Sequence, residues 1–305
     1  MSYFEDLTNK NPILLLDGGL SNVLESYGCN LNHSLWTAKL LIEDPESIVQ
    51  AHYDYIRAGA QIISTISYQA SLPGFTSLGI DQYEAVQLII KSVDLAQIAV
   101  DKAIEQEIIE ERPLIAGSLG PYGAFLVDGS EYRGNYGVSK NELRVFHSSR
   151  IDILKSTNID LFGFETFPSY EEVSVIAELL MPIVIPSWIS FSCKDDSYIN
   201  DGTRIEECVE LINDHPSIYA IGINCTHPQY ISGLIKKIKV STEKKIIIYP
   251  NSGEVYDPVS KTWLGLDQPL NFSKLAKEWI NLGADIIGGC CRIGPRHISE
   301  LKQML

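Results

Sequence analysis

Short apolar segments alternate with amphipathic ones along this chain, and the alternation repeats eight times. Each apolar segment is rich in Ile, Val and Leu, as buried strands are, and each is followed by a stretch with apolar residues at helical spacing. The predicted strands are 13–17, 61–67, 113–120, 160–166, 183–192, 219–225, 245–251 and 284–291. The helices are predicted near 45–58, 81–107, 139–156, 169–180, 203–213, 228–239, 271–282 and 295–304.

This order of elements limits the fold to one class. Strands that are apolar along their whole length are buried on both faces, as in a parallel sheet that helices cover. Eight such units within 305 residues favour an α/β fold, a single (β/α)8 TIM barrel, over an open doubly wound sheet. Because no low-complexity linker interrupts the pattern, we expect one domain over residues 1–305.

The charge of the chain argues against polyanionic partners. With 24 Lys and Arg against 39 Asp and Glu, the formal net charge is −15, and an acidic surface repels nucleic acid and anionic lipid. The N-terminal segment lacks the basic and apolar regions of a signal peptide, and no apolar run is long enough to span a membrane. We therefore expect a cytoplasmic protein that acts on small molecules and binds neither nucleic acid nor membranes.

Three of the six cysteines end predicted strands, where a TIM barrel builds its active site. Cys225 ends the sixth strand, and Cys290 and Cys291 end the eighth. Thiolates from two such strand ends can share one ion, and three protein ligands leave the open fourth position of a catalytic zinc site. We interpret these cysteines as the ligands of a Zn²⁺ ion through which they act in catalysis.

The remaining cysteines and one histidine have simpler interpretations. We predict that three cysteines are small buried apolar residues, which is how most free cysteines behave: Cys29, Cys193 and Cys208. In an oxidised sample, Cys290 and Cys291 could form a vicinal disulfide. His227 is a candidate fourth ligand, but its position before a proline favours a role at the start of the next helix.

A zinc ion held by three thiolates suits one kind of chemistry. Because the centre is negatively charged, it activates water poorly, but it can bind a substrate thiol and keep it deprotonated. A free thiol has a pKa of about 8.5, whereas a coordinated one is a thiolate at neutral pH. The sulfur then attacks an electrophile bound nearby.

Eight segments resemble those of the homocysteine S-methyltransferase family. They are LDGGL (16–20), SLWTAKLL (34–41), STISYQAS (64–71), GSLGPYGA (117–124), ETFP (165–168), GINC (222–225), YPNSGE (249–254) and GGCCR (288–292). A single segment is only suggestive, but the full series, in order over nearly the whole chain, is specific. The resemblance implies a homocysteine-binding barrel with zinc at Cys225, Cys290 and Cys291.

The resemblance also implies which residues hold the amino-acid part of homocysteine: Asp17, Gly18, Gly19 and Glu165. Backbone amides at a glycine turn can receive a carboxylate, and the two acids can accept from an ammonium group. The alternatives are a turn-forming role for Asp17 and a buried ion pair for Glu165.

On the donor side, the resemblance places Trp36 where the family offers an aromatic face to a methylated onium group. Cation–π attraction of about 0.5–2 kcal/mol is consistent with that role, and ordinary apolar packing is the alternative. Tyr68, Gln69 and Asn251 follow strand ends and are predicted to bind substrate without assigned roles. Arg292 is expected to form an ion pair at the barrel rim.

Two features point to the methyl donor. Betaine-using relatives carry a long C-terminal oligomerisation arm, whereas this chain ends at Leu305, and its YQAS segment (68–71) resembles the branch that uses S-methylmethionine. The resemblance therefore implies direct transfer from S-methylmethionine, or from S-adenosylmethionine as a second donor, to homocysteine. We expect a monomer or weak oligomer that makes methionine.

Other cofactors and functions remain as alternatives. No D-x-H-x-x-G segment favours a cobalamin route, and neither G-x-G-x-x-G nor a P-loop occurs. One alternative is a related methyltransferase that acts on selenocysteine or another thiol. The other is a non-catalytic barrel that binds zinc or thiols, which predicts a fourth protein ligand on the metal.

Overall fold

Eight parallel strands form the barrel that the alternation predicts. The computed structural model describes residues 3–32, 35–257, 262–264 and 271–305. The strands are β1 (Leu14–Leu15), β2 (Ile62–Ser64), β3 (Leu114–Leu119), β4 (Leu161–Phe167), β5 (Ser187–Phe191), β6 (Ile218–Asn224), β7 (Lys245–Tyr249) and β10 (Ile286–Ile287). They pair in the order β1-β10-β7-β6-β5-β4-β3-β2, and a parallel bridge between Leu16 and Ile62 joins the two edges.

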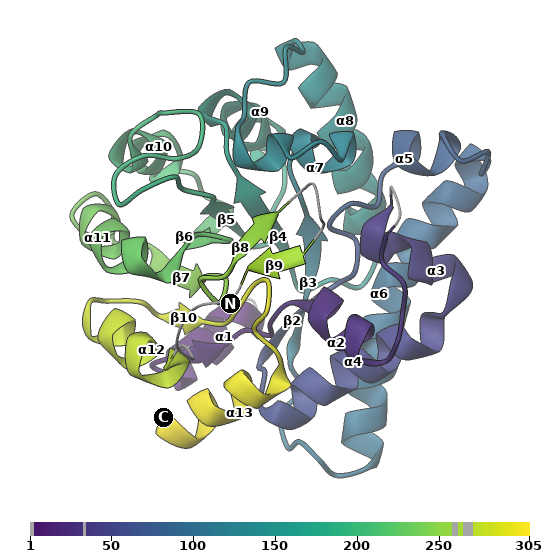
Figure 1. Ribbon diagram of the computed structural model, residues 1–305, viewed down its shortest axis with the longest axis horizontal. Coiled ribbons are helices and arrows are strands. Elements are labelled where there is room, and N and C mark those ends of the chain that lie inside the picture. The colour runs from purple at the N-terminus through teal and green to yellow at the C-terminus, as the bar shows by residue number, and fades with distance from the viewer. Residues whose placement is uncertain (1–2, 33–34, 258–261, 265–270) are drawn as a thin grey trace.

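A ring of helices surrounds the strands, as Figure 1 shows. The main helices are α4 (Pro45–Ala58), α6 (Gln82–Glu105), α8 (Lys140–Lys155), α9 (Tyr170–Leu180), α10 (Ile205–Ile212), α11 (Pro228–Lys239), α12 (Phe272–Asn281) and α13 (Pro295–Met304). Each follows its strand as predicted, with ends that differ from the predicted ones by a few residues. The predicted (β/α)8 fold is confirmed.

Local sequence signals explain where these helices begin. The Asp44 side chain accepts from the amide of Ser47 at the start of α4, where Pro45 occupies the first turn. Ser139 and Glu142 form a capping box at the start of α8. Such caps satisfy amides that have no partner within the helix.

The strand predicted at 183–192 is too long at its beginning. β5 starts at Ser187, directly after Pro186, which has no amide hydrogen to give to a neighbouring strand. The structure also contains elements that the sequence analysis did not predict. They are α1 (Tyr3–Lys10), α2 (Leu20–Ser26), η1 (Trp36–Lys39), α3 (Leu40–Glu43), α5 (Leu72–Thr76), α7 (Tyr122–Leu126), η2 (Ser130–Tyr132) and the hairpin β8 (Val255–Asp257) with β9 (Thr262–Leu264).

The barrel interior is a separate core from the layer between strands and helices. Phe4 and Leu7 of α1 pack into this interior cluster, which also contains Trp188 and Tyr249. The Trp188 indole donates to the Tyr249 hydroxyl at 2.9 Å. Gly163 makes room for the indole, since a Cβ there would lie 2.5 Å from a Trp188 ring atom. The interior is therefore packed with side chains, and the site lies above it. None of the helices in the described ranges has the length and apolar character needed to cross a bilayer.

Candidate metal centre

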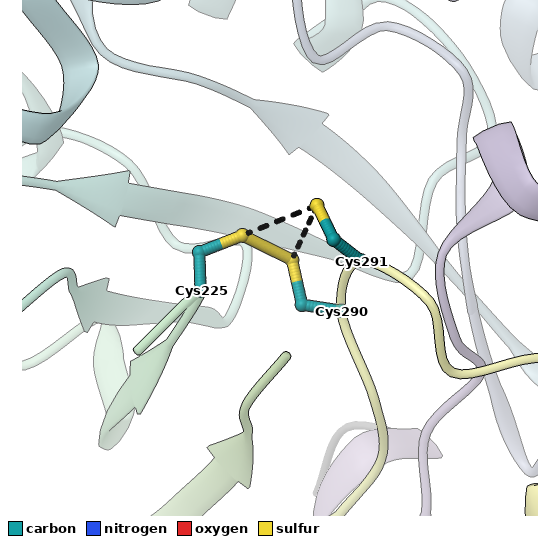
Figure 2. A group of neighbouring side chains, drawn as sticks. All are labelled: Cys225, Cys290 and Cys291. Atoms are coloured by element: carbon teal, nitrogen blue, oxygen red, sulfur yellow. Dashed lines mark hydrogen bonds between the residues drawn. A yellow bond between two sulfur atoms is a disulfide. The ribbon is translucent and has the colours of Figure 1, made fainter. Parts of the chain in front are cut away.

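The three cysteines predicted as metal ligands lie together at one end of the barrel. Their Sγ atoms are all within 4.8 Å of one another. Cys225 directly follows β6, and Cys290 and Cys291 follow β10. Figure 2 shows the three side chains pointing toward one another from these two strand ends. Cys290 and Cys291 are neighbours in the chain, but 65 residues separate Cys225 from Cys290, so only the fold brings Cys225 to the pair.

Two of the three spacings between the sulfur atoms fit a tetrahedral metal ion. Zn–S bonds of about 2.3 Å place neighbouring sulfurs roughly 3.8 Å apart. The Cys291 Sγ lies 3.9 Å from that of Cys225 and 4.0 Å from that of Cys290. Within the described residues this group has three members. A set of three thiol ligands leaves one tetrahedral position for another molecule.

Cys225 and Cys290 are joined by a disulfide in this structure. The vicinal bond between Cys290 and Cys291 that was considered for an oxidised sample is not formed here: Cys291 is free, and its Sγ lies 4.0 Å from that of Cys290. The Cα atoms of Cys225 and Cys290 are 5.6 Å apart, which lies in the usual range for a disulfide. Since metal ligands must be thiolates, the reduced protein is the form that can hold an ion.

Asn224, which the sequence analysis missed, links the cysteines to β4. Its side-chain oxygen accepts from the Thr166 amide at 2.7 Å, and its Nδ2 donates to the Thr166 hydroxyl at 2.8 Å. The same Nδ2 lies 4.0 Å from the Cys290 Sγ. A buried amide donor beside a thiolate stabilises its negative charge and fixes its orientation. The only sequence signal was its position next to Cys225.

Asp17 is buried and Glu165 is partly buried, and the two acids lie at the ends of β1 and β4, at the same mouth. Asp17 is 2% exposed and accepts from the Ser64 amide at 2.8 Å. Burial raises the pKa of Asp17 well above its ordinary value, and the charge of Glu165 raises it further. Burial also raises the pKa of Glu165 to about 7, although hydrogen bonds from Ser118 and Tyr249 oppose the shift.

No Lys, Arg or His in the described part of the chain forms an ion pair with either carboxyl. The ion pair considered for Glu165 is therefore absent there. The Asp17 carboxylate accepts from Ser64 of the neighbouring strand β2. A buried and a partly buried acid without a cation are costly for a fold, and such pairs are typical of sites that bind a charged group.

The two glycines after β1 are required by close backbone contacts. A Cβ on Gly18 would lie 2.3 Å from the Ile293 carbonyl oxygen, and one on Gly19 would lie 2.7 Å from that of Cys290. The Gly19 amide donates to Ile293 O at 3.0 Å. The Gly19 amide is therefore already bonded within the protein. Binding of the homocysteine carboxylate by the Gly18 amide stays a prediction.

The predicted donor-side aromatics lie side by side. The rings of Trp36 and Tyr68 meet edge to face, with centroids 6.2 Å apart. Trp36 has φ +46°, a conformation that is unfavourable for a bulky residue. Its ring also packs against the outer core, as the alternative interpretation required. The two roles are compatible because the side chain is only partly buried.

Arg150, another residue that the sequence analysis missed, holds the segment that contains Tyr68. Its buried guanidinium donates to four carbonyl oxygens, those of Ser67, Tyr68, Ala70 and Gly120. Planar, multiple donors make arginine suited to organising a loop in this way.

Two further predicted substrate residues make local contacts. Gln69 donates to the Ala124 carbonyl at 2.7 Å. Asn251 accepts from the Gly253 amide at 3.0 Å, and so it shapes the turn after β7. Their roles toward substrate remain predictions.

His227 and Arg292 behave as predicted. The His227 Nδ1 accepts from the Gln229 amide at the start of α11, and His227 does not belong to the cysteine group. Arg292 donates to Glu254 at 2.7 Å in a partly exposed ion pair.

Two of the three remaining cysteines match their prediction. Cys193 and Cys208 are buried, but Cys29 is only partly so. The prediction is wrong for Cys29, whose Sγ lies 3.8 Å from a carboxylate oxygen of Asp44.

Comparison with known proteins gives consistent matches over the full length of the chain. The model of the homocysteine S-methyltransferase family matches residues 14–305. The chain is 44% identical to homocysteine S-methyltransferase YbgG of Bacillus subtilis, over 99% of this chain and 97% of that protein. It is 42% identical to the homocysteine S-methyltransferase of Escherichia coli, over 97% and 96% of the two chains.

Solved structures agree with these matches. The homocysteine methyltransferase MmuM from Escherichia coli, in its metallated form, superposes with a TM-score of 0.90 at 38% identity and covers 99% of both chains. Its oxidized form gives a TM-score of 0.89 with the same identity and coverage.

Proposed function

The chain belongs to the homocysteine S-methyltransferase family, and we propose that it transfers a methyl group from a sulfonium donor to the thiol of homocysteine. The proposed donor is S-methylmethionine, with S-adenosylmethionine as a second donor. The proposal rests on one observation above all: three cysteine sulfurs within 4.8 Å of one another share a mouth with Asp17 and Glu165, two carboxyls that have no ion-pair partner among the described residues.

The reaction balances without an oxidant or reductant. The bond between the methyl carbon and the donor sulfur breaks, and its electron pair stays on the donor sulfur. A new bond forms between that carbon and the homocysteine sulfur, which loses its proton. With S-methylmethionine, both products are methionine.

Zn²⁺ is the metal that we propose for Cys225, Cys290 and Cys291. When bound, it supplies the charge that lowers the pKa of a coordinated substrate thiol, so that the thiol is a nucleophile at neutral pH. The protein orients these ligands, and Asn224 lies against Cys290 with a donor group.

Asp17 and Glu165 are proposed to bind the ammonium group of homocysteine. Each carboxylate offers oxygen acceptors within the buried mouth, where charge-assisted hydrogen bonds are strong. The Asp17 carboxyl is fixed by the Ser64 amide, and Tyr249 supports Glu165. Both acids are thereby positioned before substrate arrives.

Trp36 and Tyr68 are proposed to face the sulfonium of the donor. A sulfonium carries positive charge but no hydrogen to donate, so an aromatic face suits it better than a hydrogen-bond acceptor does. The neighbouring rings and the residues Gln69 and Asn251 complete the predicted donor side.

One assay tests this function. Reduced, zinc-loaded protein is given homocysteine together with S-methylmethionine, S-adenosylmethionine or betaine, and methionine is measured. We expect methionine from S-methylmethionine, less from S-adenosylmethionine and none from betaine. Absence of methionine with every donor would contradict the proposal. Selenocysteine offered in place of homocysteine defines the range of acceptors.

A further inference from the structure

Arg150, on α8, is a charged side chain inside the protein. It is 1% exposed, and the guanidinium of an arginine is charged at neutral pH. None of the arginine ion pairs in the described part of the chain involves it. A buried charge without an ion-pair partner is costly unless other groups bond to it. The groups that accept from Arg150 therefore indicate what its burial serves.

Four backbone carbonyls at the mouth of the barrel accept from this guanidinium. They are those of Ser67 at 3.3 Å, Tyr68 at 2.6 Å, Ala70 at 3.0 Å and Gly120 at 2.7 Å. The first three belong to the segment that follows β2, and Gly120 directly follows β3. Because β2 and β3 are neighbours in the sheet, Arg150 ties two adjacent strand ends together at the end of the barrel where the cysteines lie.

Tyr68 is the residue whose position these bonds determine most closely. Its carbonyl oxygen accepts from the Gly120 amide at 3.0 Å as well as from Arg150. Gly120 also leaves room for the Tyr68 ring, because a Cβ there would lie 2.7 Å from the Cε2 atom of that ring. The main chain of Tyr68 is thus fixed by Arg150 and Gly120, and its ring meets that of Trp36 edge to face.

The acids proposed to bind homocysteine are held by other groups. The Asp17 carboxylate accepts from the Ser64 amide within β2, and Glu165 lies on β4. The hydrogen bonds of the Arg150 guanidinium in the described ranges go to the four carbonyls and to neither acid. A change at Arg150 should therefore alter the donor side of the mouth and leave the homocysteine side in place.

We propose that Arg150 is a positioning residue for the methyl donor, because it sets the Tyr68 ring against Trp36 where the sulfonium is bound. This inference rests on the proposed function, since it assumes a sulfonium donor at these two rings. Arg150 acts through Tyr68 and does not touch the substrate. Cation–π attraction requires the cation to lie over the face of a ring, and a misplacement of about 1 Å can slow a reaction roughly 10²-fold.

The test is Arg150→Lys, which keeps the positive charge but has three hydrogens at one point in place of a planar fork of five. Binding of S-methylmethionine and of homocysteine to reduced, zinc-loaded protein is measured by calorimetry, each ligand alone. We expect the dissociation constant of S-methylmethionine to rise about tenfold and that of homocysteine to change less than about twofold. The matched control is Arg144→Lys on the same helix, where a partly exposed side chain pairs with Glu178; it should leave both constants unchanged.

A double mutant separates this role from general support of the fold. If Arg150 acts through the Tyr68 ring, Arg150→Lys should weaken donor binding less than about twofold in a Tyr68→Leu background, because effects of coupled residues do not add. Gly120→Ala places a methyl group against the same ring. It should reproduce the selective loss of donor binding, and it keeps the test decisive if Arg150→Lys does not fold.

Unchanged donor binding in folded Arg150→Lys or Gly120→Ala would overturn the proposal. Equal weakening of both ligands, or a full effect of Arg150→Lys in the Tyr68→Leu background, would overturn it as well. Because binding is measured without turnover, the two proposals fail separately. Wild type that binds S-methylmethionine but makes no methionine would contradict the proposed reaction, and the binding ratios would still decide the role of Arg150.

Discussion

Backbone conformation marks the site at the scale of single residues. Of the seven non-glycine residues with positive φ in the described ranges, four lie beside or among the cysteines, the acids or the aromatic pair: Trp36, Thr166, Cys225 and Arg292. Such conformations cost roughly 1–3 kcal/mol in non-glycine residues and concentrate at functional sites. The surrounding fold must hold these residues in their unfavourable conformations.

The ligand assignment predicts the behaviour of Cys225→Ser. A hydroxyl is a poor zinc ligand beside two thiolates, so the variant should lose stoichiometric zinc and at least 99% of its activity while its circular dichroism spectrum is unchanged. Metal content is measured by atomic emission after reduction and reloading. The control is Cys29→Ser, at a free cysteine that does not belong to the group, which should keep both. Stoichiometric zinc in Cys225→Ser would refute the assignment.

The substrate assignment predicts a selective effect of Glu165→Gln. A hydrogen bond to a charged partner contributes about 1.5–3 kcal/mol, so loss of the carboxylate should raise the KM for homocysteine by about tenfold or more. The KM for S-methylmethionine is expected to change little. Steady-state kinetics with each substrate varied in turn gives both values. A larger effect on the donor would move Glu165 to the donor side.

Single residues also show where sequence analysis ends. The cysteines, Asp17 and Glu165 stand in recognisable segments at strand ends, and so they were predicted. Asn224 and Arg150 act through partners far away in the chain, which no local pattern reveals. The disulfide partner of Cys290 likewise depends on how side chains at two strand ends point.

At the scale of elements, the long strands and helices could be predicted because their periodicity extends over several turns. α1, η2 and the other short elements could not, since a few residues carry no period. In α1, Phe4 and Leu7 pack into the cluster inside the barrel. The helix has only eight residues, which is little more than two turns and too short for its apolar spacing to be recognised.

A buried histidine makes α4 sensitive to pH. Both ring nitrogens of His52 are buried without a partner in the described ranges, and burial lowers its pKa to about 4. The unfolded chain takes up a proton near pH 6.5, whereas the folded protein does not until the pH approaches 4. The free energy of unfolding is therefore not reduced by His52 above about pH 6.5, and it falls as the pH is lowered from there toward 4.

The replacement His52→Leu should remove this part of the pH dependence. By linkage, His52 alone should lower the free energy of unfolding of the wild type by about 2 kcal/mol between pH 7 and pH 5. Urea unfolding of wild type and variant at both pH values gives the difference. Identical pH dependence in the two proteins would contradict the prediction, because it would mean that the pKa of His52 is the same in the folded and the unfolded chain.

At the scale of the whole molecule, the site ties distant parts of one closed sheet together. β6 and β10 are separated by β7 in the sheet, and the candidate ligands sit on either side of it. A metal held there should stabilise the folded barrel against unfolding, because the unfolded chain cannot offer the three sulfurs together.

Removal of metal should accordingly lower the melting temperature. Zinc free at a hundred times its dissociation constant adds about 2.7 kcal/mol to the free energy of unfolding, which a chelator should abolish in the reduced protein. Cys225→Ser should melt at the same temperature with and without zinc. Differential scanning calorimetry measures both, and an equal zinc effect on the two proteins would place the metal elsewhere.

The chain separation of the cysteines has a consequence for biosynthesis. A ribosome that has released the first six strands has delivered one ligand, Cys225, and the other two emerge only 65 residues later. The nascent chain therefore passes most of its synthesis unable to chelate an ion through this group. Stable metal uptake would begin only once the eighth strand has docked against the first. A chain that holds the metal would therefore be one whose barrel has closed.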